Sequence, residues 1–257
     1  MNQTIYPTQL LKTVFKGYSK PQHMLFSDGQ TYVVKLKNNP SGTRILVNEY
    51  IAGNLGKLLK LPVVPFEVVQ IEEAFIKESP ILAKHKFQPG SQFASLYLDN
   101  CSQLVRNSQN ENVKVSNRQH LAEIIAFDLW IGNTDRKENN VLLEPLEHGE
   151  FYLHLIDHGR CFSKALWTSK SLKKMPKMEI DLNVHKWCAG FLENAAELQA
   201  AIEKIKAIPQ EAIHQVIESI PSDWDVTEEE REALVGHLVN ARKCLDHLKL
   251  SSYKRKK

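Results

Sequence analysis

The segment GNTDRKENN, residues 132–140, combines acidic, basic and amide side chains directly after an apolar run. Asp135 stands five positions before Asn140, and this D-x-x-x-x-N spacing occurs in catalytic loops for phosphoryl transfer. In such loops the aspartate accepts the proton of the acceptor hydroxyl, and the asparagine holds a metal ion. Asp and Asn also favour ordinary turns, because their side chains bond to nearby backbone. Taken alone, the segment is more typical of a turn.

Two short apolar segments, 141–143 and 151–156, follow this loop and predict a β-hairpin. If the hairpin is symmetric about its turn at 148–149, Asn140 lies directly opposite Asp157, the first residue of an Asp-His-Gly tripeptide. An amide oxygen and a carboxylate at that separation can share one hard cation. Mg²⁺ is the expected ion, because it takes few protein oxygens beside water and substrate phosphates.

Lys35 stands inside the apolar strand pattern TYVVKL, where it shares a face with Val33 and should be partly buried. A buried lysine needs a partner. In the helical pattern that follows, Glu49 lies on the same stripe as Ala52 and Gly53, which indicates that its carboxylate faces the sheet. A phosphotransfer site requires a lysine on the phosphates and a helix acid that holds it, so we predict an ion pair between Lys35 and Glu49. The alternative is a strand-edge lysine and an exposed glutamate.

Gly17 and Ser19, with nearby backbone amides, are candidates for a turn that covers phosphates. The surrounding residues match neither G-x-x-x-x-G-K-[ST] nor G-x-G-x-x-G, so a plain turn is the alternative. We expect an adenine ring between the two halves of the chain, near residues 84–90. Asp128, inside an apolar helix pattern, is expected to support the loop that carries Asp135 through hydrogen bonds.

The first hundred residues predict a small sheet around one helix. Asp28-Gly29 marks a hairpin turn, and the helix pattern over 44–61 stops before Pro62. The predicted strands lie in LLKTVF near residues 11–15, HMLF, TYVVKL and VVPFEVV. This part is therefore expected to be β-rich.

Helical patterns dominate the rest of the chain, beginning with the apolar run 118–131 after a polar stretch, 99–117, that predicts a loop. Pro209 is expected in the first turn of one helix, and Thr227 with Glu230 forms a capping box for another. The seam of that last helix is expected to face the core at Leu234, Leu238, Ala241, Leu245 and Leu248.

The composition is that of an ordinary globular chain, with 257 residues of which 42% are hydrophobic and a net charge of +3. So small a charge gives no reason to expect nucleic acid as a partner. Neither a signal peptide nor an apolar run of membrane-spanning length is found, and the four cysteines show no C-x-x-C pair. We therefore expect a cytoplasmic protein with free thiols and no membrane span.

Four segments resemble the HipA-like kinase family: YVVKLK, LVNEYIAGNL, FDLWIGNTDRKENN and LIDHGRCF, in this order over most of residues 11–165. The N-T-D-R-x-x-x-N and I-D-H-G run is also similar to phosphatidylinositol kinases. The segment PGSQFASLY, residues 89–97, looks like a recurrent family segment without an assigned role. The resemblance implies an α+β, bilobal protein-kinase-like fold. Its N-lobe, 1–98, would be small and β-rich with one helix, and its C-lobe, 99–257, mainly helical.

By the same resemblance, the chain would transfer the γ-phosphoryl group of ATP with Mg²⁺ as cofactor. Lys35 would lie on the α/β-phosphates, Glu49 would pair with it, Asp135 would be the catalytic aspartate, and Asn140 and Asp157 would bind magnesium. The acceptor would be an unidentified protein or small molecule, with a protein Ser or Thr first. Other readings are a nucleotide-binding pseudokinase that acts as a scaffold, a nucleotidyl transferase and a lipid kinase.

Overall fold

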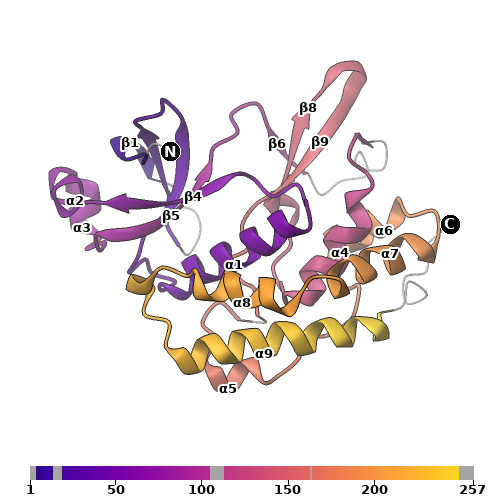
Figure 1. The fold of residues 1–257 in the computed structure, drawn as a ribbon. Helices are drawn as coiled ribbons and strands as arrows, with labels where there is room; N and C mark the ends of the chain where they lie inside the picture. The colour runs from indigo at the N-terminus through magenta and orange to yellow at the C-terminus, as the bar shows by residue number, and fades with distance from the viewer. Residues whose placement is uncertain (1–3, 14–18, 105–112, 163, 249–257) are drawn as a thin grey trace.

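The computed structural model describes residues 4–13, 19–104, 113–162 and 164–248. An N-terminal sheet packs beside a larger, mainly helical C-terminal part, and a β-hairpin projects from the latter (Figure 1). The α+β class is therefore confirmed.

The N-terminal sheet is antiparallel and has the strand order β1-β2-β3-β5-β4. The Asp28-Gly29 turn joins β2 to β3; Gly29 has a φ of 78°, and the Asp28 carboxylate accepts a hydrogen bond from the backbone of Gln30. Alternate residues of β2 and β3 are buried in one cluster with Met24 and Val34 at its centre. The strands are β1 (Pro7–Thr13), β2 (Gln22–Phe26), β3 (Thr31–Lys35), β4 (Phe66–Ile71) and β5 (Gly90–Leu96).

PGSQFASLY, for which no element was predicted, forms β5 in the interior of this sheet. Two short helices, α2 (Glu73–Glu78) and α3 (Pro80–Lys84), add to the one helix that the sequence predicted for this part. They lie at the outer end of the sheet (Figure 1).

The predicted helix is α1 (Arg44–Leu58), which ends because Lys60 adopts a φ of 58° shortly before Pro62. Gly53 lets the helix approach the ring of Phe66 closely. The buried side chains of α1, such as Leu46, Ile51 and Leu55, belong to the same hydrophobic cluster as the C-terminal helices. Thus α1 is packed into the main core as well as against the N-terminal sheet.

A second sheet has the order β6-β8-β9-β7. The polar stretch predicted as a loop supplies two of its strands, β6 (Ser102–Gln103) and β7 (Lys114–Val115); residues 105–112 lie outside the described residues. The predicted hairpin is β8 (Val141–Pro145) and β9 (Glu150–Leu155).

The predicted register of this hairpin is wrong by one residue. Val141 pairs with Leu155, and the backbone N–H of Ile156 donates to the carbonyl of Asn140, so Ile156 and not Asp157 lies opposite Asn140. The connection, η3 (Glu147–Gly149), has three residues. The centre of the turn is therefore the middle residue, His148, and not a point between His148 and Gly149. His148 and Gly149 both have left-handed backbones, with φ of 59° and 73°.

The C-terminal part is built around α4, which contains the apolar run that precedes the polar loop. Helices α6 and α7 pack on one side of α4, and the indole N–H of Trp130 donates to the carbonyl of Leu238 in α9 at 2.9 Å. The helices are α4 (His120–Trp130), α5 (Ser169–Leu172), α6 (Asn183–Gly190), α7 (Ala195–Lys206), α8 (Gln210–Glu218) and α9 (Glu228–Cys244), with 3₁₀ turns η2 (Glu138–Asn140), η4 (Ser222–Trp224) and η5 (Leu245–His247).

The predicted signals of the last two long helices are present. Pro209 is the N-cap residue of α8, one position before the expected first turn, and Thr227 and Glu230 form the capping box of α9. All five residues of the predicted α9 seam are buried. In the described ranges, no helix has both the length and the apolar composition that crossing a bilayer requires.

Two glycine substitutions test the packing of α1. An alanine Cβ at Gly53 would lie 2.3 Å from a ring carbon of Phe66, whereas one at Gly236 in α9 would meet nothing within 4 Å. Alanine is favoured over glycine in a helix by about 1 kcal/mol, but overpacking a core costs about 1–3 kcal/mol. In urea unfolding, Gly53→Ala should lower the free energy of unfolding, and Gly236→Ala should raise it. Stabilisation by both would contradict this packing.

Candidate active site

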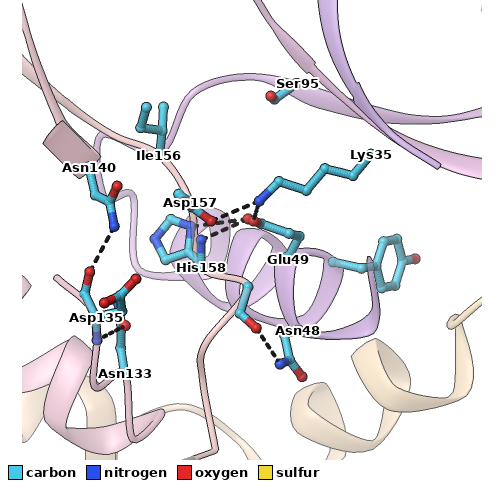
Figure 2. Close-up of polar contacts among 12 residues, drawn as sticks. Lys35, Asn48, Glu49, Ser95, Asn133, Asp135, Asn140, Ile156, Asp157 and His158 are labelled. Atoms are coloured by element: carbon cyan, nitrogen blue, oxygen red, sulfur yellow. Dashed lines mark hydrogen bonds and ion pairs between the residues drawn. The ribbon is translucent and has the colours of Figure 1, made fainter. Parts of the chain in front are cut away.

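The side chain of Lys35, at the end of β3, joins the two parts of the molecule. Its ammonium pairs with the carboxylate of Glu49 in α1 and lies 2.7 Å from the Asp157 carboxylate, just after β9 (Figure 2). Lys35 and Glu49 are buried, as predicted, while the side chain of Asp157 is 48% exposed. Lys35 and Asp157 are therefore in contact although they are 122 positions apart in the chain.

Electrostatics favour the charged states of Lys35 and Glu49. Burial alone would lower the pKa of Lys35, but the carboxylates of Asp157 and Glu49 outweigh that effect and raise it. Burial would likewise raise the pKa of Glu49, yet the Lys35 ammonium and a hydrogen bond from His158 hold it well below its usual range. Lys35 and Glu49 therefore stay ionised at neutral pH.

Helix α1 also holds the chain that follows Asp157. The second oxygen of Glu49 accepts the backbone N–H of His158 at 2.9 Å. The amide of Asn48, fully buried, donates to the carbonyl of Gly159 at 2.7 Å and accepts the indole N–H of Trp167 at 2.6 Å. A Cβ on Gly159 would lie 2.9 Å from the Ile45 side chain. The Gly of the Asp-His-Gly tripeptide thus leaves room for α1.

The backbone of Asp157 has a φ of 57°, which is uncommon for a residue other than glycine. A conformation of this kind costs of order 1–3 kcal/mol, and the surrounding contacts must maintain it. Here the salt bridge of the Asp157 side chain with Lys35 and the hydrogen bond from the next residue, His158, to Glu49 hold this conformation. The strain directs the Asp157 carboxylate toward Lys35.

Asp135 and Asn140 are brought together by the polar loop. The side-chain amide of Asn140 donates to the backbone carbonyl of Asp135 at 2.7 Å, and the Asp135 backbone N–H donates to the side chain of Asn133 at 3.0 Å. The carboxylate of Asp135 lies 2.6 Å from the ammonium of Lys137. In Figure 2, Asp157 lies between this pair and Lys35.

A buried hydrogen-bond network fixes this loop. Of its side chains, the sequence had indicated only Asp128. The guanidinium of Arg136 donates to both oxygens of Asp128 at 2.8 and 3.0 Å and to the carbonyls of Asn140 and Ile156 at 3.1 and 2.8 Å. His185 of α6 lies 3.1 Å from the same carboxylate. Arg136 therefore ties the polar loop to the end of β9.

Asp128 is the centre of this network, in line with its expected support of the loop. Its buried carboxylate also accepts the amide of Asn133 at 2.9 Å. Burial would raise the pKa of Asp128, but the charge of Arg136, with a hydrogen bond from His185, lowers it well below its usual range. The signal in the sequence was a charged residue inside an apolar helix. Its partners are Asn133 and Arg136 of the loop that follows this helix and His185, 57 positions further along the chain.

Two oxygens in the site are suited to a divalent cation. Because its amide nitrogen bonds to Asp135, Asn140 keeps its side-chain oxygen as an acceptor, and Asp157 has one carboxylate oxygen beyond the one that contacts Lys35. The described residues contain no cluster of three His, Cys, Asp or Glu side chains that would form a closed metal cage. One amide and one carboxylate fit Mg²⁺ that is completed by phosphates and water.

The phosphate-covering turn stays a prediction. Gly17 lies outside the described residues, and Ser19 is half-buried in the connection between β1 and β2. The expected place of the adenine ring, near residues 84–90, also stays a prediction. Residues 84–90 run from the end of α3 to the first residue of β5, and Phe87 is buried in the cluster of the first sheet. Residues 97–101 link β5 to β6 of the second sheet.

Comparison with known proteins gives matches over nearly the whole chain. The sequence profile of HipA-like kinases matches residues 8–257. The crystal structure of the Helicobacter pylori proinflammatory kinase CtkA is similar with a TM-score of 0.62 and 15% identity, covering 96% of this chain and 94% of that chain. No curated protein sequence matches significantly.

Two further structures are similar. The structure of hydra Fam20 with sugar has a TM-score of 0.54 and 15% identity, covering 95% of this chain and 85% of that chain. The Golgi casein kinase with Mn/ADP bound has a TM-score of 0.51 and 13% identity, covering 95% and 73%. At these identities the likeness shows the fold, which is that of protein kinases.

Replacing Glu49 by Gln should change how stability depends on pH. A carboxylate whose pKa falls on folding stabilises the fold above its ordinary pKa of 4.5, and this contribution is lost as the pH falls further. We expect Glu49→Gln to lose about 3 kcal/mol at pH 7, because a buried ion pair is broken. The difference from the original protein should shrink below about pH 4. Urea unfolding between pH 7 and pH 3 measures it.

Glu232→Gln, on the exposed face of α9, is the matched control and should be neutral over the whole range. If the difference in free energy of unfolding between the original protein and Glu49→Gln stays constant down to pH 3, the Glu49 carboxylate does not titrate as this geometry requires.

Proposed function

Because this chain belongs to the HipA-like kinase family and is a kinase, we propose that it transfers the γ-phosphoryl group of ATP to a hydroxyl acceptor, with a protein Ser or Thr as the first candidate. The proposal includes Mg²⁺ as cofactor, cytoplasmic location and a division into lobes at residues 98 and 99.

One observation carries the proposal: the ammonium of Lys35 pairs with the carboxylates of both Glu49 and Asp157 (Figure 2). Two carboxylates around one ammonium leave it charged and restrict its position. A fixed ammonium beside an exposed carboxylate is the arrangement needed to orient a polyphosphate that arrives with a divalent cation. A purely structural ion pair has no need of a third, exposed partner in a strained backbone conformation.

The other residues follow from this placement. Asn140 and Asp157 would hold Mg²⁺, which when bound would supply positive charge to neutralise the phosphates. Asp135 would orient the acceptor hydroxyl and receive its proton, held by its backbone bond to Asn133. Catalysis would consist mainly of positioning and charge stabilisation. The Golgi casein kinase, whose structure is described with Mn/ADP bound, supports the use of a nucleotide and a divalent cation.

Substitution of Asp135 tests the mechanism. With γ-labelled ATP, Mg²⁺ and a host lysate, Asp135→Ala and Asp135→Asn should transfer label at least about 100-fold more slowly than the original protein, because a general base contributes about 10²–10⁴-fold. ATP affinity should stay nearly unchanged, since the phosphates contact Lys35 and the metal ligands. Asp181→Asn, an exposed aspartate before α6, is the matched control and should keep full activity.

Three outcomes would contradict the proposal, and the last two would each favour another function. Equal incorporation by Asp135→Ala would remove this residue from the mechanism. Transfer of α-label with no γ-label would indicate a nucleotidyl transferase. Binding of Mg-ATP, seen as a higher melting temperature, without transfer to any protein, lipid or small-molecule fraction would indicate a pseudokinase.

A further inference from the structure

Residues 219–230 of the C-terminal part contact both the N-terminal sheet and α1, and we call them the clamp segment. It includes η4 and the capping box of α9. We propose that the clamp segment is a positioning element for phosphoryl transfer, which keeps α1 and β3 in the relative placement that the Lys35–Glu49 ion pair requires. Its effect on rate rests on the proposed function; its effect on α1 does not.

The first set of contacts joins the clamp segment to β5 and to the residues after β3. The carboxylate of Asp223 lies 2.6 Å from the ammonium of Lys37 and accepts the backbone N–H of Ser91 at 2.9 Å. The indole N–H of Trp224, which is fully buried, donates to the carbonyl of Ser91 at 2.8 Å. Lys37 is two residues beyond Lys35, so β3 is held next to its functional lysine.

The glycine in the segment PGSQFASLY, Gly90, is required by the contact with the clamp segment. A Cβ at Gly90 would lie 2.5 Å from a carboxylate oxygen of Asp223 and 2.8 Å from the Lys37 ammonium, and its φ is +107°. Any side chain there would enter the salt bridge. The segment that the sequence singled out without a role is the docking site of the clamp segment on the sheet.

A second set of contacts joins the clamp segment to α1. The guanidinium of Arg44, the first residue of α1, lies 2.6 Å from both carboxylate oxygens of Glu230. The hydroxyl of Tyr50, one residue after Glu49, donates to Ser219 at 2.9 Å. The ring of Tyr50 also packs edge-on against Trp224, with centroids 5.8 Å apart. The helix is therefore held at its first residue and next to its functional glutamate.

The clamp segment is itself anchored in the C-terminal part. Glu230 accepts the backbone N–H of Thr227 at 3.0 Å and so caps α9 while it binds Arg44. Helix α9 accepts the hydrogen bond from Trp130 at the end of α4, just before the polar loop. Packed helices and hydrogen bonds thus connect α1 to the loop that carries Asp135.

This arrangement has a kinetic consequence. An ion pair between a strand and a helix is kept only while both elements keep their places, and a shift of about 1 Å at a catalytic group can cost about 100-fold in rate. Because the chain supplies these contacts itself, α1 needs no partner protein to hold Glu49 at Lys35.

The test loosens α1 at Arg44 and leaves the capping box intact. We expect Arg44→Gln to speed amide hydrogen exchange in α1 and in residues 157–167, and to lower kcat about tenfold with a smaller change in the KM for ATP. The matched control is Arg242→Gln, which removes a guanidinium that donates to the carbonyl of Ile208 at 2.7 Å, away from the clamp segment. It should leave exchange in α1 and kcat unchanged at temperatures where both variants are folded.

A double-mutant cycle separates positioning from general destabilisation. If Arg44 acts through Glu49, Arg44→Gln should change kcat less than about twofold in a protein that already carries Glu49→Gln. If the two residues act independently, the fold-changes in kcat of the two single variants should multiply in the double variant. Unchanged exchange in α1, unchanged kcat or multiplicative effects would overturn the proposal. If no variant transfers phosphate but exchange in α1 rises in Arg44→Gln, the proposed function fails while the hold on α1 stands.

Discussion

A buried lysine that must be paired is the constraint on which the rest of this structure depends. An unpaired buried charge costs several kcal/mol, so Lys35 has to meet a carboxylate, and Glu49 has to meet a cation. Each of these residues lies on an element whose own packing is set elsewhere. The sheet and α1 must therefore be aligned before the charges are satisfied, and Asp157 enters as a third, more exposed partner.

Helix α1 connects the buried ion pair to the rest of the molecule, because it contacts the sheet, the backbone after Asp157 and the C-terminal core. One face approaches the sheet closely, since Gly53 has no side chain to hold Phe66 away. Asn48 and Glu49 fix the backbone after Asp157. Its remaining buried residues join the core of the C-terminal helices. One helix therefore places Lys35, the backbone that follows Asp157 and the main core relative to one another.

Several features could be predicted because they depend on neighbours in the chain. The helix stop before Pro62, the Asp28-Gly29 turn and the capping box of α9 are local and are present as expected. The hairpin was also predicted, but its register was wrong by one residue, because the number of residues in the turn depends on backbone conformations at His148 and Gly149. Asp157 still reaches the site, since its own left-handed backbone reorients it after the strand has ended.

The sequence by itself determined which residues have the chemistry of the site: a lysine in an apolar strand, an acid on a helix stripe, and Asp135, Asn140 and Asp157 in a spacing typical of kinases. Only the tertiary structure decided what holds them. Arg136 and His185 both bind the carboxylate of Asp128, and Asp223 pairs with Lys37, through contacts for which the sequence has no periodic signal. Local patterns record the conformation of a segment, whereas a salt bridge between distant segments exists only once the core has brought them together.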